Sequence, residues 1–99
     1  MWYAIRGHDA PDALALRRVA RASHIDRLEA LRDAGRLMVA GPLPAIDSAE
    51  PGPAGFVGSL VIAQFASLEE ARTWALADPY AVQGAWSHAD VDPFVPVLP

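Results

Sequence analysis

Cysteine is absent from this chain of 99 residues. Without thiols there is no disulfide framework, no thiolate zinc site and no cysteine nucleophile. The absence is typical of proteins kept in a reducing compartment, so we expect a cytoplasmic protein.

An excess of positive charge is also lacking, because the formal net charge at pH 7 is -4. Nucleic acids and anionic membranes both attract Lys and Arg, so neither is an expected partner. No apolar run reaches the length of a membrane span, and the N-terminus lacks the basic, apolar and small-residue order of a signal peptide. We therefore expect no membrane segment.

The composition is that of one folded domain. Hydrophobic residues make up 53% of the chain and charged residues 20%, a balance that can bury a real core. A domain of this size has a thin margin of stability. Burial of further apolar surface between copies is therefore expected, and the predicted assembly is a homodimer.

Six segments of regular structure are predicted, in the order strand, helix, strand, strand, helix, strand. Gly7 is expected to end the first strand, and Gly41-Pro42 the second. The strands are predicted at Trp2–Ile5, Arg36–Ala40, Phe56–Phe65 and Trp86–Val95, and the helices at Pro11–Asp33 and from Ser67 onward.

Three local features of the helices are predicted from capping patterns. The long helix either runs unbroken from Pro11 or bends near Ser23, which would then cap a second piece with Asp26 as its partner. Ser67 and Glu70 form a second capping box. Asp78 either ends the second helix or caps a further short one.

The order of these segments is that of an α+β ferredoxin-like fold, the split βαβ pattern. Such a fold has a four-stranded antiparallel sheet with both helices on one face. The other face has no cover within the chain, and a second copy is its simplest cover. Phe56, Leu60 and Ile62 lie either near that open face or near the core, depending on a register that the sequence leaves open.

Proline and glycine dominate the segment from Gly41 to Gly55, which is predicted to be a loop. This loop is long for so small a domain. Long loops in compact domains are often functional, but a proline-stiffened hairpin connection is an equal alternative.

His24 shares one face of the long helix with Leu28 and Leu31, at spacings of four and seven residues. A titratable ring therefore lies on the stripe that faces the rest of the protein. The ring is either a core-edge histidine with one nitrogen satisfied or a functional group, because a buried histidine is only a probabilistic indicator of function.

Several kinds of chemistry are not expected. No two histidines have metal-ligand spacing, and His8 and His88 are interpreted as surface residues, so no metal and no cofactor is predicted. The stretch Gly52-Pro53-Ala54-Gly55 is not expected to bind phosphate, because a phosphate-binding loop needs free backbone N–H groups and Pro53 has none. Ser59 lies inside a strand and not in a nucleophile elbow.

A histidine with a carboxylate remains as the candidate chemistry, because the acid can orient the ring and hold its charged form while the other nitrogen works on a substrate. Spacing does not decide among Asp26, Asp33, Asp47 and Asp78 as that acid. Arg17 and Arg21, four residues apart, either bind an anionic substrate or form a solvated helix face.

Taken together, the order and spacing of several short segments make the chain resemble the YciI family (YCII-related domain). The segments are Tyr3-Ala4-Ile5, Arg17 and Arg21 ahead of His24, Arg27-Leu28, Gly35-Arg36-Leu37, Ala40-Gly41-Pro42, Ala45-Ile46-Asp47, Ala54-Gly55-Phe56, Gly58-Ser59, Ser67-Leu68-Glu69, Ala77-Asp78-Pro79-Tyr80 and Val91-Asp92-Pro93-Phe94.

The resemblance implies a single ferredoxin-like domain over residues 1–99 that dimerises through its sheets as a dimeric α/β barrel. It also implies an active site built on a histidine and an aspartate, which map to His24 and Asp78. The family is similar in fold to muconolactone isomerase, and one member group acts as a dehydrochlorinase on a chlorinated hydroxyquinol.

The predicted function is that of a small cofactor-independent lyase or isomerase. His24, oriented by Asp78, would transfer a proton on a small anionic or aromatic substrate, and Arg17, Arg21 and Ser59 would bind that substrate. The alternative is a non-catalytic dimeric module that binds a small ligand or a partner protein.

Overall fold

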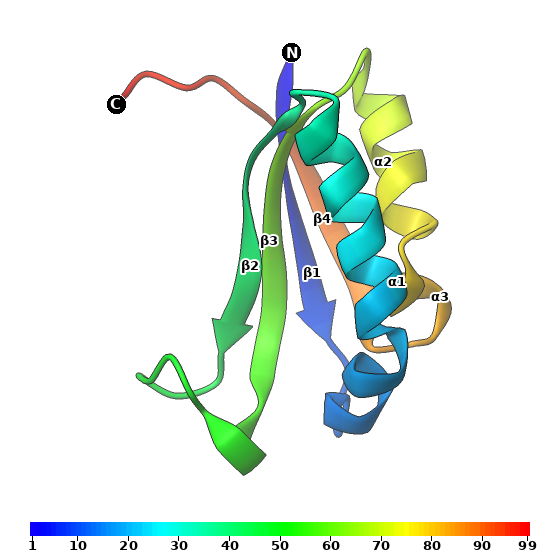
Figure 1. Cartoon of the computed structure of the whole chain (residues 1–99), viewed down its shortest axis with the longest axis vertical. Coiled ribbons are helices and arrows are strands. Elements are labelled where there is room, and N and C mark those ends of the chain that lie inside the picture. The colour runs from blue at the N-terminus through cyan, green and yellow to red at the C-terminus, as the bar shows by residue number, and fades with distance from the viewer.

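The computed structural model describes residues 1–99 and contains four strands, two full helices and two short helical turns (Figure 1). In chain order they are β1 (Trp2–Asp9), α1 (Leu14–Asp33), β2 (Leu37–Pro44), the 3₁₀ turn η1 (Gly52–Ala54), β3 (Phe56–Gln64), α2 (Leu68–Leu76), α3 (Pro79–Val82) and β4 (Trp86–Phe94).

The four strands form one sheet in the order β2-β3-β1-β4, and every neighbouring pair is antiparallel. The α+β class, the antiparallel sheet and the βαββαβ order predicted above are confirmed. Figure 1 shows the helices on one side of the sheet and no element over its other side. None of the helices combines the length and the apolar character that crossing a bilayer requires.

Alternation along the strands separates the two faces of the sheet. On the helix side, Ile5 of β1 lies opposite Val61 of β3, and these side chains are almost fully buried at the centre of the core. Ala4 and Ile62, the next pair in the same register, point to the uncovered face. Of the two predicted alternatives for Ile62, the register therefore selects the open face and not the core.

The first strand is longer than predicted, because Gly7 does not end it. The indole of Trp86 packs against this position so closely that a Cβ on Gly7 would lie 2.2 Å from a ring carbon. Gly7 is thus required for close contact inside a continuous strand, and β1 runs on to Asp9.

Helix α1 is unbroken, which is one of the two predicted alternatives, and Ser23 does not cap a second piece. Ser23 is exposed in the middle of the helix, and the run of Ala, Leu and Arg around it contains no residue that would stop a helix. The helix begins at Leu14 and not at Pro11, since the residues before it form a turn in which Asp12 has φ of 56°. Because the helix continues without a bend, Val19 stays 75% exposed.

Two other predicted caps are confirmed. Ser67 Oγ accepts a hydrogen bond from the Glu70 amide at 3.1 Å, and Glu70 Oε2 accepts one from the Ala66 amide at 3.1 Å. Asp78 begins α3: its Oδ1 accepts a hydrogen bond from the Tyr80 amide at 2.9 Å. The local sequence at both helix starts therefore specifies where the chain turns.

The predicted loop from Gly41 to Gly55 is partly a strand, because β2 continues through Pro42 to Pro44. Proline has no N–H to donate to a ladder, and it is tolerated here because β2 is an edge strand with one neighbour. The irregular connection is thus confined to residues 45–55, with η1 near its end.

Candidate active site

The ring of His24 lies against the carboxylate of Asp78. Nδ1 of His24 is 2.8 Å from Oδ1 and 3.0 Å from Oδ2 of Asp78, although the two residues are 54 positions apart in the chain. His24 is 6% exposed and Asp78 is fully buried. Among the four carboxylates that the sequence left open, Asp78 is the one that meets this histidine.

Three donors surround the Asp78 carboxylate. Besides the His24 ring, the Tyr80 amide donates at 2.9 Å and Arg27 Nη1 donates at 3.3 Å. A buried carboxylate needs such partners, because it loses the hydration that would otherwise stabilise its charge. Arg27 is itself held by the Trp74 carbonyl at 3.0 Å and by stacking on the Trp74 ring.

These contacts define which nitrogen of His24 carries the proton in the neutral ring. An ionised carboxylate only accepts hydrogen bonds, so Nδ1 must be the protonated nitrogen. Nε2 is then an unprotonated acceptor, which is the state that a general base requires.

Aromatic rings hold the imidazole in place. The Tyr80 ring stacks on His24 at a centroid distance of 4.0 Å and an angle of 11°, and Trp86 meets the ring edge-on at 5.9 Å. Burial raises the pKa of the Tyr80 phenol above 10.0, although the positive charges of Arg17 and Arg21 oppose the shift. The phenol is therefore protonated and neutral at physiological pH.

A cleft of about 520 Å³ opens between α1 and the β2–β3 half of the sheet. Its lining combines apolar, aromatic and cationic side chains: Leu14, Arg17, Arg18, Arg21, His24, Ile25, Leu28, Ala40, Gly41, Pro42, Gly52, Phe56, Ser59, Leu60, Val61 and Tyr80. His24 Nε2 has no hydrogen-bond partner and is not a fully buried atom, so this nitrogen faces the cleft. The lining holds one histidine and no carboxylate, a donor set unsuited to a metal.

Arg17 does not lie on a solvated helix face, as one alternative held, because it is 5% exposed. Nε and Nη2 donate to the two oxygens of Asp9 at 2.6 and 2.8 Å, a bidentate ion pair whose acid is also nearly buried. Nη2 also reaches the Gly58 carbonyl at 2.8 Å and Ser59 Oγ at 2.9 Å. Arg17 therefore ties α1 to β1 and β3.

This arrangement leaves specific donors for a ligand at the floor of the cleft. Ser59 Oγ accepts from Arg17, so the Ser59 hydroxyl hydrogen is free, and the Arg17 guanidinium brings a positive charge to the same place. The rings of Phe56 and Tyr80 lie on the guanidinium of Arg17 at 4.8 and 4.9 Å.

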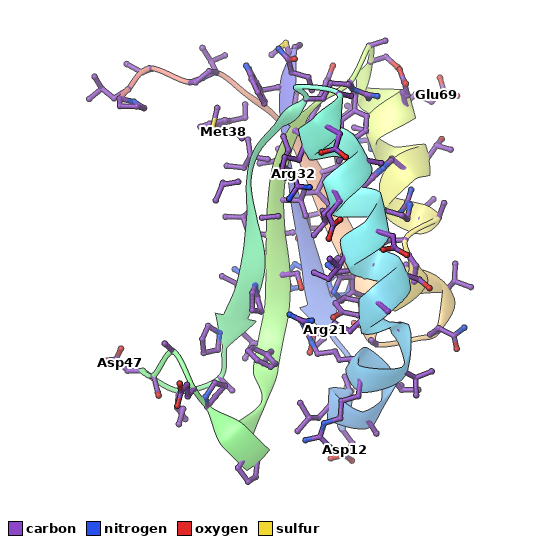
Figure 2. The ribbon with its side chains drawn as sticks, in the orientation of Figure 1. Asp12, Arg21, Arg32, Met38, Asp47 and Glu69 are labelled. Carbon is purple, nitrogen blue, oxygen red and sulfur yellow. The ribbon has the colours of Figure 1, made fainter.

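Arg21 is exposed at the edge of the cleft, together with Arg18, and neither forms an ion pair within the chain. Figure 2 shows Arg21 extending from α1 toward the sheet. The same view shows Asp47 at the outer end of the β2–β3 connection, away from α1, so this candidate acid does not reach the cleft.

Three residues of the site were not among the predicted ones. Tyr80 and Arg27 had a signal, since both lie in segments that carry the family resemblance, but no spacing rule connected them to His24. Asp9 had no signal, because it was expected in a turn and its partner Arg17 lies on the following helix.

The fold and the cleft define a class: small α+β proteins with a ferredoxin-like sheet and a buried His–Asp pair at the base of a cationic cleft. The sequence matches the model of the YCII-related domain over residues 1–95, and the chain belongs to this family.

The relatives match over their whole length. Protein YciI of Escherichia coli O6:H1 is 52% identical over 98 residues, which cover 99% of this chain and 100% of the relative. An uncharacterized protein of Haemophilus influenzae is 45% identical over 98 residues, with the same coverage. The predicted family membership is confirmed.

The solved structures with a similar fold include that of a dehydrochlorinase. It is 5-chloro-2-hydroxyhydroquinone dehydrochlorinase (TftG) from Burkholderia phenoliruptrix in complex with 2,5-dihydroxybenzoquinone, with a TM-score of 0.82 and 24% sequence identity. The match covers 96% of this chain and 94% of that chain. At this identity the likeness establishes a shared fold.

Proposed function

We propose that this protein is a cofactor-independent lyase or isomerase in which His24 and Asp78 transfer a proton on a small anionic or aromatic substrate. The proposal rests on the different surroundings of the two ring nitrogens of His24. Nδ1 is bound to a fully buried carboxylate, whereas Nε2 faces the cleft without a partner.

In the proposed reaction, His24 Nε2 takes a proton from an acidic C–H or O–H group of the substrate. The electron pair left behind forms a new double bond, and the imidazolium is stabilised by the Asp78 carboxylate. In an isomerase the same ring returns the proton to another carbon. In a dehydrochlorinase the electron pair expels chloride, and the proton leaves later to solvent.

The cleft suits a flat molecule with at least one negative oxygen. A volume of about 520 Å³ lies within the range of small-molecule sites. The guanidinium groups of Arg21 and Arg17 would stabilise the charge of an enolate or phenolate, and the Ser59 hydroxyl would bind a second oxygen. The Phe56 ring offers an apolar surface at the same place.

We also propose that two chains associate through the uncovered sheet face to form a dimeric α/β barrel. Val39 of β2 and Ile62 of β3 lie opposite each other on this face, and Val39 is 50% exposed although it is apolar. A second sheet packed on this face would remove such side chains from water. The cleft lies on the helix side, so dimerisation would leave it open.

The test combines ligand binding with turnover. The first probes are 2,5-dihydroxybenzoquinone, chosen because the structurally similar TftG binds it, and a panel of chlorinated hydroxyquinols, enols and lactones. We expect turnover of one panel member. We also expect the ¹⁵N chemical shifts of the His24 ring to change when the ligand is added, as measured by ¹H–¹⁵N NMR.

The matched variants are Asp78→Asn and Asp47→Asn, which remove one carboxylate each, inside and outside the site. We expect Asp78→Asn to reduce kcat by about 100-fold or more and Asp47→Asn to leave it unchanged. Equal turnover in both variants would remove the His–Asp pair from the mechanism. Binding without turnover of any panel member would favour the alternative, a ligand-binding module.

A further inference from the structure

Three side chains with metal-ligating atoms gather on the uncovered face of the sheet, away from the cleft. His8 of β1 lies directly opposite His88 of β4 in the antiparallel register, and Asp90 is two residues further along β4. Residues two apart on a strand share a face, and a directly opposed residue on the neighbouring strand lies beside them. The topology therefore forms a triangle of donors from residues far apart in the sequence.

The donors are close enough to share one ion. One ligand atom from each side chain can be chosen so that all three lie within 4.8 Å of one another. His8 Nε2 is 2.7 Å from Asp90 Oδ2, and the two imidazole rings stack at 4.2 Å with an angle of 6°.

A neighbouring serine selects the nitrogen of His88 that would bind. Ser87 Oγ donates to the His8 carbonyl at 3.3 Å and lies 2.9 Å from His88 Nδ1. When the single serine hydrogen is on the carbonyl, Nδ1 of His88 is the donor in the second contact. Nε2 of His88 is then unprotonated, the state that a metal requires, and Ser87 orients the ring as outer partners of metal-bound histidines do.

We propose that His8, His88 and Asp90 form a binding site for a divalent transition-metal ion, with Zn²⁺ as the best match. Two imidazoles and one carboxylate are donors that Zn²⁺ accepts readily, whereas Mg²⁺ and Ca²⁺ prefer sites made of oxygen alone. Three protein ligands leave a fourth position for water.

Binding requires a small movement and the release of a proton. The proton that His8 Nε2 shares with Asp90 is replaced by the ion, so it passes to solvent. Two ligands of Zn²⁺ at about 2.0–2.1 Å lie roughly 3.3 Å apart in tetrahedral geometry, so the 2.7 Å contact must open by about half an ångström. The side chains of His8 and Asp90 are 28% and 62% exposed and can move.

The other charges on this face balance one another. Arg6 lies opposite Asp90 in the register and adds a positive charge, whereas Asp92 lies opposite Ala4 and adds a negative one. On β3, the residues opposite His8 and Arg6 are Gly58 and Leu60, which carry no charge. With Asp90 itself, the two carboxylates outnumber the one guanidinium near the site.

The test is isothermal titration calorimetry of the untagged, metal-free chain with ZnCl₂ and, as a comparison, MgCl₂. We expect one Zn²⁺ per chain with proton release that scales with the ionisation enthalpy of the buffer, and no heat from Mg²⁺. Co²⁺ should bind at the same sites and give a visible spectrum of low-symmetry coordination.

The variants are His88→Ala and Asp90→Asn, with Asp92→Asn as the matched control on the same strand face. All three positions are exposed in the single chain, so the variants should fold like the parent chain, as checked by circular dichroism. Because they lie on the sheet face proposed as the dimer interface, sedimentation velocity checks that each variant keeps the parent's oligomeric state. We expect the two ligand variants to lose at least about tenfold in Zn²⁺ affinity, and Asp92→Asn to lose none. Wild-type affinity in either ligand variant, or no Zn²⁺ binding by the parent chain, would overturn the proposal.

Discussion

Replacing Asp78 by Asn should release His24 from a single tautomer, and this can be measured without knowing the substrate. Asn is nearly the same size as Asp and can still cap α3 by accepting the Tyr80 amide through Oδ1. Its Nδ2 group takes the place of Oδ2, 3.0 Å from His24 Nδ1, and is a donor, whereas Oδ1 stays an acceptor at 2.8 Å. Nδ1 can therefore donate to Oδ1 or accept from Nδ2, so both tautomers of the ring should be populated.

The cost in stability follows from the contacts that the variant keeps and loses. The cap and one hydrogen bond to His24 are kept, whereas the 3.3 Å contact with Arg27 loses its charge. Breaking a fully buried ion pair costs about 3–5 kcal/mol, but Arg27 is 25% exposed and retains the Trp74 carbonyl, so we expect about 2 kcal/mol.

Asp78→Ala provides the comparison, because it also removes the cap and leaves His24 Nδ1 without a partner. A lost cap costs about 1 kcal/mol and an orphaned buried donor about 1–3 kcal/mol. We therefore expect about 4 kcal/mol for Asp78→Ala, measured by urea unfolding.

The tautomer is read from the ¹⁵N chemical shifts of the two ring nitrogens, which differ widely between protonated and unprotonated states. In the parent chain Nδ1 should show the protonated shift, and in Asp78→Asn it should move toward the unprotonated one. An unchanged pattern in a folded Asp78→Asn variant would refute the assignment of Asp78 as the group that orients this ring.

Three further predictions concern stability and assembly. The Tyr80 pKa is raised by burial, so the unfolded chain ionises first and stability should fall as the pH rises above 10.0; Tyr80→Phe should lack this part of the fall in urea midpoints. Gly7→Ala should lower the free energy of unfolding by about 3 kcal/mol, because the new methyl group meets the Trp86 ring, whereas Gly41→Ala, with open space around it, should change it by less than about 0.5 kcal/mol. Ile62→Lys should convert a dimer into a monomer in sedimentation velocity, and a parent chain that is already monomeric would contradict the proposed sheet-to-sheet interface.

Local signals in the sequence were sufficient for much of the fold. The capping residues Ser67 and Asp78 mark the starts of α2 and α3, because a cap acts through hydrogen bonds within a few residues. Ser23 has the same local signal and does not cap, since the strong helix formers on both sides of it favour one continuous helix.

The pairing of His24 with Asp78 was not predictable from spacing. The two residues meet because α3 docks against α1, and such a contact between distant segments leaves no periodic signal. The family resemblance pointed to this pair, whereas the residues alone left four carboxylates open.

The same limit explains why the contacts of Arg17, and the contact between His8 and His88, were not predicted. Arg17 was consistent with a solvated face until its partner Asp9 was seen at the end of a strand expected to stop at Ile5. His8 and His88 have no ligand spacing along the chain, and they meet because the register of β1 and β4 places them opposite each other. A cytoplasmic location stays a prediction.

One oxygen of Asp78 holds two things at once: the amide of Tyr80 at 2.9 Å and the imidazole of His24 at 2.8 Å. The first turn of α3 and the orientation of the ring consequently form a single cooperative unit, which is lost or kept as a whole. Isotope exchange at that amide would therefore report how often the acid–base centre comes apart, with no substrate present.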